Sequence, residues 1–492
     1  MLFRSGRDQY LDDTAEARSR RLSYRDYIAR LLELAGFDRA PTRADAVLAL
    51  ETEIARSHAT EQESGKESNA DHHWAQADFP QQAPGLDWAE FFSAAGLAKQ
   101  QDIVVWQPGT IKGAAALVAA QPLAVWQDYL RFHLIDGFAD VLPRAFADVA
   151  AAFRGTAQDQ RAQRAIDETS KALPDAVGRL YVERYFPATT KAKLQEIAGQ
   201  VSEALGQRVQ AVTWLSPTGK AKARAKLKTL YLGVGYPKQW PDDSRLLIEP
   251  TDAAGNRQRV WAWNYRNALA KLDQPVDLHE WAQAAQAPLA LLNFLQNSCV
   301  FSAALLQAPK FTPAASDAAN YGAVGAIFGH EMSHFIDTLG ADYDEQGATN
   351  HWWTKEERAQ FDAAGQPLIE QFSGYRAFSD LAINGQLTLG ENVADLGGLS
   401  AAFDAYRRTL GRRAGDKQYL REQDRQFFIG YAQAWRSKLS ESALREQAKS
   451  NDHAPDRFRI STVRNIDAWY DAFDVQPGQA LFLEPKARVR IW

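Results

Sequence analysis

The sequence predicts a mainly α-helical protein with a small β-sheet near its middle. Most apolar residues recur at helical spacing, and turns containing Pro or Gly separate the helical segments. Strand signals are few and cluster near the middle of the chain. The 492 residues suffice for two or three domains with a large core, and 46% hydrophobic and 24% charged residues are typical of a globular protein.

The first half of the chain is expected to be almost entirely helical. In YRDYIARLLELAGF (24–37), the apolar residues Ile28, Leu31, Leu32 and Leu34 form one stripe, and the helix is expected to end near Gly36. The same spacing predicts further helices within 43–59, 121–153, 174–206 and 218–229.

Three segments rich in β-branched and aromatic residues are expected to be extended. They are LLIEP (246–250), QRVWAWNY (258–265) and NSCVFSA (297–303). After residue 305 the chain becomes helical again, and a domain boundary is expected near 250–280.

Charge and cysteine content exclude several classes of protein. The formal net charge of −5, from 56 basic and 61 acidic residues, gives no reason to expect binding to nucleic acid or to an anionic membrane. Cys299 is alone, so no internal disulfide forms, and a buried thiol is expected. Neither a membrane span nor a signal peptide is expected, because no long apolar run occurs and the start lacks an apolar core.

Two histidines lie four residues apart in GAIFGHEMSHFIDTLG (325–340). A helix is predicted over 317–339, so His330 and His334 share one face and can direct a ring nitrogen at the same metal ion. Glu331 lies beside them, which completes the H-E-x-x-H pattern of zinc peptidases, where the glutamate activates water. The alternative is a pair of histidines on a buried helix with hydrogen-bond partners of their own.

A catalytic zinc needs a third protein ligand. Glu391, at the start of a second predicted helix in LTLGENVADLGGLSAAFDAY (387–406), is the best candidate. Asp395 shares its helix face and could accept a hydrogen bond from a ligand histidine, as could Asp337. The alternative for Glu391 and Asp395 is a solvated helix face, against which the apolar neighbours Leu389, Val393 and Leu396 argue.

These motifs resemble those of the neprilysin-like M13 zinc metallopeptidases. NYGAVGAIFGHEMSHFID resembles the zinc helix of that family, and GENVADLGG resembles its E-N-x-x-D motif. Further similarity lies in WLSPTGKAKARAKL, VGYPKQW, DRQFFIGYAQAWR (424–436), HAPDRFRI (453–460) and the terminal VRIW. The resemblance implies a two-lobed fold with a thermolysin-like zinc-helix core. It also implies a helical cap lobe (1–255), a hinge (256–279) and a catalytic lobe (280–492).

The resemblance also implies roles for individual residues. One zinc ion per chain would be bound by His330, His334 and Glu391, with Glu331 as general base and Asp395 orienting a ligand histidine. His453 would donate to the developing oxyanion, and Arg459 would hold a substrate carbonyl. The substrate is expected to be a small peptide. Ala290 would lie on the strand that pairs with it, and an apolar pocket for it would consist of Leu305, Ile327 and Trp435.

The chain departs from the family pattern at several positions. Leu289 occupies the place of an asparagine that binds substrate backbone, Lys310 replaces an aromatic residue, and Phe335 replaces a glycine. The N-terminal helical region is expected to be shorter than in the family. Leu289, Lys310 and the shorter N-terminal region motivate an alternative to a metalloendopeptidase, namely a zinc-binding pseudo-peptidase that captures peptides without turnover. The presence of Glu331 and His453 argues against this alternative.

Overall fold

The protein is mainly helical, as predicted. The computed structural model describes residues 6–155 and 161–492, and it divides into two compact units. The first unit reaches Ala172 and includes Asp242–Pro275, and the second contains Leu173–Pro241 and Val276–Trp492. The lobe boundaries given above stay a prediction.

The first unit is built from helices around a core of aromatic and aliphatic side chains. The predicted helix in 24–37 is part of α2, which Thr14 caps by accepting a hydrogen bond from the backbone of Ala17. Three residues of the predicted stripe, Ile28, Leu31 and Leu32, are fully buried, whereas Leu34 at the end of the helix is only half-buried. The elements of this unit are α1 (Asp8–Leu11), α2 (Ala15–Leu34), α3 (Ala40–Ser57), α4 (Glu61–Ser64), β1 (His73–Ala75), α5 (Phe79–Gln82), α6 (Trp88–Ala94), β2 (Asp102–Val104), α7 (Pro108–Ala120), α8 (Leu123–Phe138), α9 (Arg144–Arg154), α10 (Arg161–Ala172) and α14 (Ala253–Ala270).

The extended structure predicted for 258–265 is wrong, because this segment lies inside α14. The side chain of Asp252 caps that helix by accepting a hydrogen bond from the backbone N–H of Gly255. The polar and small residues on either side of VWAWNY (260–265) continue the helix. The predicted strand at 246–250 does not form either. Short apolar runs of this kind do not distinguish strand from helix by their periodicity.

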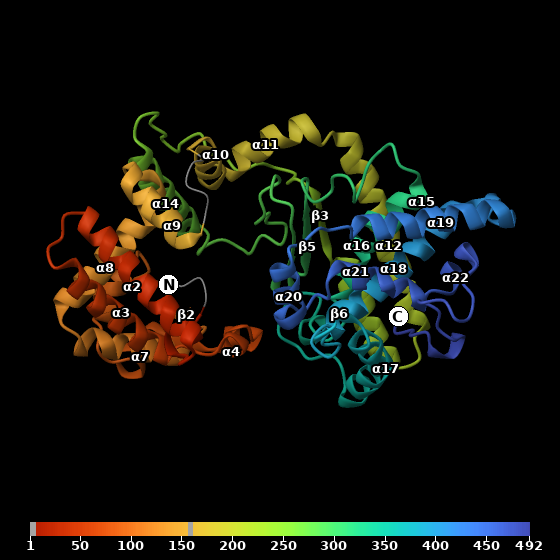
Figure 1. The fold of residues 1–492 in the computed structure, drawn as a ribbon, viewed down its shortest axis with the longest axis horizontal. Coiled ribbons are helices and arrows are strands. Elements are labelled where there is room, and N and C mark those ends of the chain that lie inside the picture. Colours follow the sequence, from red (N-terminus) through yellow and green to blue (C-terminus); the bar gives the residue numbers. More distant parts are fainter. Residues whose placement is uncertain (1–5, 156–160) are drawn as a thin grey trace. The chain divides into compact units, whose positions relative to one another are not determined.

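The second unit contains helices and a three-stranded sheet, and it is coloured mainly green to blue in Figure 1. The histidine pair belongs to this unit. Its elements are α11 (Pro174–Tyr185), α12 (Ala188–Ala211), α13 (Pro217–Thr229), β3 (Tyr231–Gly235), β4 (Ala290–Asn293), β5 (Ser298–Ser302), α15 (Asp317–Asn320), α16 (Ala326–Ser333), α17 (Lys355–Ser373), β6 (Arg376–Phe378), β7 (Leu381–Ala382), α18 (Leu389–Thr409), α19 (Lys417–Ala434), α20 (Glu441–Ser450), α21 (Asp456–Arg459) and α22 (Asp467–Phe473).

Strand β5 is the centre of that sheet, whose order is β3–β5–β4. It pairs in parallel with β3, placing Leu232 opposite Cys299, and antiparallel with β4, placing Leu291 opposite Val300. All five residues of β5 are buried, which confirms the strand predicted in 297–303 and the buried Cys299. Strand β4 is left as an edge of this sheet.

The predicted helix over 317–339 is interrupted and ends early. Ser316 caps α15 through its side chain, a π-helical turn follows at Tyr321–Gly325, and α16 ends at Ser333. Helices α16 and α18 then approach at Gly329 and Gly398. A Cβ on Gly398 would lie 2.3 Å from the backbone nitrogen of His330, so only glycine permits this contact. The close approach brings α18 against the histidine pair. No helix in the described ranges has the length and apolar character needed to span a membrane.

Candidate metal centre and active site

The two histidines meet as their spacing predicts. His330 and His334 are 3% and 4% exposed, and their Nε2 atoms lie 3.3 Å apart. Their Nδ1 atoms are held by buried carboxylates, since His330 Nδ1 lies 2.9 Å from Asp395 Oδ1 and His334 Nδ1 lies 2.9 Å from Asp337 Oδ2. An Nδ1–H that donates to a carboxylate leaves the Nε2 lone pair available for a metal ion.

Helix α18 supplies a third candidate ligand. Glu391 Oε2 lies 3.2 Å from His330 Nε2, and its Oε1 lies 3.6 Å from His334 Nε2. Burial would raise the pKa of Glu391, but the neighbouring imidazoles lower it well below its ordinary value. Burial would lower the pKa values of both histidines, but the neighbouring carboxylates raise them: Asp395 and Glu391 act on His330, and Asp337 and Glu391 act on His334. Asp395 lies one turn further along α18, on the same face, as predicted.

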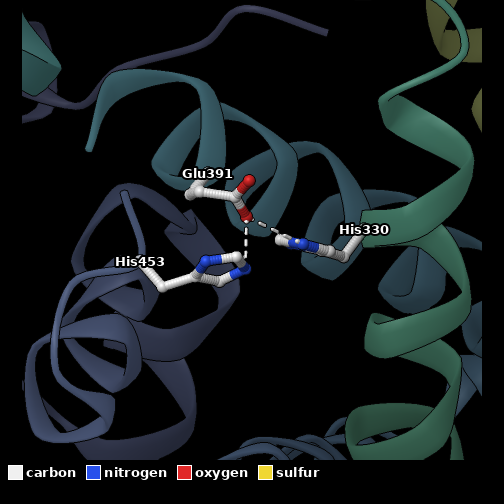
Figure 2. Close-up of side chains that lie close together, drawn as sticks. All are labelled: His330, Glu391 and His453. Atoms are coloured by element: carbon white, nitrogen blue, oxygen red, sulfur yellow. Dashed lines mark ion pairs between the residues drawn. The ribbon is translucent and has the colours of Figure 1, made fainter. Parts of the chain in front are cut away.

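His453 approaches the same carboxylate from the loop after α20. Figure 2 shows His330 and His453 both directed at one oxygen of Glu391. His453 Nε2 lies 2.9 Å from Glu391 Oε2, and His453 Nδ1 lies 2.9 Å from Asp452 Oδ1. The sequence analysis did not single out Asp452, whose only visible signal is that it precedes His453 in the chain. His330, Glu391 and His453 thus offer three ligand atoms within 4.8 Å of one another.

Two sets of three ligands are therefore possible, with His330 and Glu391 common to both. They differ in the support of the third histidine. Asp337, behind His334, has a side chain only 1% exposed, whereas Asp452, behind His453, is 64% exposed. Glu391 Oε2 is buried and lies near the Nε2 atoms of His330 and His453, but neither contact has the geometry of a hydrogen bond, so a cation would satisfy this oxygen. A convergent set of imidazole nitrogens and one carboxylate fits zinc.

Arg459 is tied to this centre through Asp395. The guanidinium, only 5% exposed, donates from Nε to Asp395 Oδ2 at 2.8 Å and from Nη2 to Oδ1 at 2.7 Å. Burial would raise the pKa of Asp395, but Arg459 and the contact with His330 lower it to about 2. Trp435 covers the guanidinium, whose carbon lies 3.7 Å from the ring centroid.

Glu331 differs from the other acidic residues of the centre. Asp337, Asp395 and Glu391 all contact histidines, whereas the part-exposed carboxylate of Glu331 forms no hydrogen bond or ion pair with the residues that the structure describes. A carboxylate beside His330 without a partner is available to water or substrate.

The residues predicted to bind substrate lie in different settings. Ala290 is on the edge strand β4, opposite Phe301 of β5. Ile327 is buried in the main core cluster, and Leu305 and Trp435 are half-buried side chains packed against that cluster. The burial of Ile327 therefore does not distinguish a substrate pocket from ordinary packing in the core.

The positions that depart from the family pattern are spread over the same unit. Leu289, just before β4, is 54% exposed. Phe335 is fully buried and packs against Phe294, with ring centroids 5.0 Å apart. Lys310 is half-buried, and burial lowers its pKa.

Comparison with known proteins identifies the family and the fold of the chain. Two family models described as peptidase family M13 match residues 2–237 and 291–489. The fold is similar to the zinc metalloprotease Zmp1 of Mycobacterium tuberculosis, solved with an inhibitor, at a TM-score of 0.85 and 34% identity, covering 99% of this chain and 76% of that one. It is also similar to PepO of Lactobacillus rhamnosis, at a TM-score of 0.85 and 25% identity, covering 99% and 77%.

Curated relatives extend the similarity across nearly the whole chain. A neutral endopeptidase of Lactobacillus helveticus is 30% identical over 83% of this chain and 62% of its own length. Neprilysin-3 of Drosophila melanogaster is 26% identical over 99% of this chain and 65% of its own length. The chain therefore spans somewhat less than two thirds of these relatives. With both family models and a relative of 34% identity matched, the chain belongs to peptidase family M13, the neprilysin-like metallopeptidases.

Proposed function

We propose that the chain is a zinc-dependent metalloendopeptidase that hydrolyses small peptides. The observation that supports this most is the pair of Nε2 atoms 3.3 Å apart, with both Nδ1 atoms held by buried carboxylates and Glu391 facing them. One zinc ion would be held by His330, His334 and Glu391. His334 is preferred to His453 as a ligand because its supporting carboxylate is buried.

Zinc, when bound, supplies Lewis-acid chemistry: it makes water more acidic and stabilises negative charge. Glu331 accepts a proton from the attacking water and passes it to the leaving amine nitrogen. One water is consumed, the peptide C–N bond breaks, and a carboxylate and an amine are formed. The lack of a partner for Glu331 within the described residues suits this role.

His453 and Arg459 would act on the substrate carbonyl groups. His453 lies beside Glu391 and can donate from Nε2 to the oxyanion once that nitrogen is protonated, and its pKa is raised by Glu391 against the effect of burial. Arg459 uses Nε and Nη2 on Asp395, which leaves Nη1 for a carbonyl oxygen of the substrate. Leu305, Ile327 and Trp435 would favour an apolar residue after the scissile bond. Peptides with Leu or Phe there should be cut faster than those with Asp or Gly.

The test is cleavage of a quenched fluorescent peptide library by the zinc-loaded chain, with Glu331→Gln as the matched variant. Cleavage that disappears in the variant and with a chelator supports the endopeptidase. One bound zinc per chain without any cleavage would instead favour the pseudo-peptidase, to which the exposed Leu289 just before the substrate strand points.

A further inference from the structure

Lys226 is a lysine enclosed in the core of the second unit. It lies on the inner face of α13, its side chain is 1% exposed, and Nζ donates to the carbonyl oxygens of Gly340 at 2.5 Å and Tyr343 at 2.7 Å. No carboxylate in residues 6–155 or 161–492 forms an ion pair with it. A fully buried ammonium is costly and rare, so its two acceptors must be important to the local structure.

The turn that Lys226 holds lies directly on the end of the zinc helix. Gly340 packs so closely there that a Cβ on it would lie 2.1 Å from the carbonyl carbon of Phe335 and 2.5 Å from the carbonyl oxygen of His334. Ala341 donates its backbone N–H to the carbonyl of Asp337 at 2.8 Å. The same turn therefore contacts His334 and is hydrogen-bonded to the backbone of Asp337, whose side chain orients the His334 ring.

The charge of Lys226 also suits this position. Four carboxylates act on it, Asp337 most strongly, and then Asp344, Asp342 and Glu345. Burial lowers the pKa of Lys226 to about 8 in spite of them, so the group is still mostly protonated at pH 7. A cation just beyond the C-terminus of α16 is also favoured by the helix dipole.

The two histidines then have parallel support. His330 is oriented by Asp395, whose charge is balanced by Arg459 through two direct hydrogen bonds. His334 is oriented by Asp337, and the buried cation of Lys226 acts on this pair through the backbone of the Gly340–Tyr343 turn.

We propose that Lys226 is a positioning residue for the metal centre: by holding the Gly340–Tyr343 turn, it keeps Asp337 on His334 and so sets how tightly zinc is bound. The inference rests on the proposed function, in which His334 is a zinc ligand. It adds a residue of α13, more than a hundred positions away in the chain, to the support of that ligand.

The test compares Lys226→Met with Lys191→Met. Lys191 also donates to one backbone carbonyl, that of Tyr236 at 2.7 Å, but this carbonyl is not part of the Gly340–Tyr343 turn. Zinc affinity is measured by chelator competition on folded protein, and Lys226→Met is expected to bind zinc about 10- to 100-fold more weakly, as when a residue behind a ligand is lost. Lys191→Met should bind like the wild type. With Co²⁺ in place of zinc, only Lys226→Met should change the visible absorption, which reports ligand geometry.

A second variant keeps the proposal testable if Lys226→Met does not fold. Trp352 Nε1 donates to the same Gly340 carbonyl at 3.1 Å, so Trp352→Phe removes one hydrogen bond from the turn. Trp352→Phe should weaken zinc binding about fivefold, as expected for the loss of one ordinary hydrogen bond. If Lys226→Met folds and its zinc affinity and cobalt spectrum are unchanged, the role of Lys226 is overturned, but the proposed function is not. If only Trp352→Phe folds, an unchanged zinc affinity and cobalt spectrum in that variant has the same meaning. A wild-type chain that binds no zinc would overturn the proposed function together with the role of Lys226.

Discussion

Replacing Asp395 by asparagine should damage both the stability of the second unit and its affinity for zinc. The carboxylate is 2% exposed and accepts from His330 Nδ1, Arg459 Nε and Arg459 Nη2 at 2.9, 2.8 and 2.7 Å. Asparagine retains one oxygen and presents an NH₂ group to donors. Arg459 would then stay buried without a counter-charge.

The size of the effect follows from that burial. Removing one partner of a buried ion pair costs about 3–5 kcal/mol, a large share of the roughly 5–15 kcal/mol that stabilises a domain. Asp395 has a pKa of about 2 in the folded chain and 3.8 ordinarily, so its contribution is present above about pH 4 and is lost as the pH falls towards 2. Asp395→Asn should lack this acid dependence. Zinc should bind about 10- to 100-fold more weakly.

Urea unfolding of the zinc-free chain, followed by circular dichroism from pH 2 to 7, measures the first effect, and chelator competition measures the second. Asp362→Asn is the matched control, because Asp362 pairs with Arg358 at 3.0 Å while the two side chains are 50% and 55% exposed. Its loss should cost no more than about 1 kcal/mol. If Asp395→Asn cost no more than this control and bound zinc normally, the reasoning from burial would be refuted.

Three further predictions concern other parts of the unit. Glu331→Gln should lower kcat/KM for peptides by about 10²- to 10⁴-fold without changing zinc content, and loss of zinc from this variant would contradict its role as general base. Gly398→Ala should destabilise the unit and weaken zinc binding, because the new Cβ would lie 2.3 Å from the nitrogen of His330; a melting temperature equal to wild type would rule out that contact. Burial raises the pKa of Asp424 to about 6, although Arg407 opposes this, so the group destabilises the folded state as the pH rises from about 4 through 6. Asp424→Asn should therefore gain up to about 3 kcal/mol at pH 7.5 and little at pH 4, and unfolding curves equal at both would contradict the shift.

Helical spacing predicted the parts of the site that lie on single helices. His330 and His334, and likewise Glu391 and Asp395, are four residues apart, and α-helical geometry alone puts each pair on one face. Composition was a poorer guide at 258–265, where aromatic and β-branched residues suit either a strand or a helix and the Asp252 cap favoured the helix.

Some contacts between distant segments could not be predicted from one sequence. Arg459 and Asp395 pair across 64 positions, and neither has a neighbour that marks the pairing. Lys226 was not expected in the site, because its acceptors are backbone carbonyls, which any residue supplies. One signal was present: Lys226 takes an inward position on α13, together with Ala223 and Leu227, where an apolar residue is usual.

The most direct test of the account is the position of zinc in crystals of the zinc-loaded chain, located by anomalous scattering at the zinc absorption edge. We predict one peak per chain, from a zinc ion bound by Nε2 of His330, Nε2 of His334 and the carboxylate of Glu391, with His453 outside the ligand set. A peak bound by His453 in place of His334, or no peak at these residues, would contradict it.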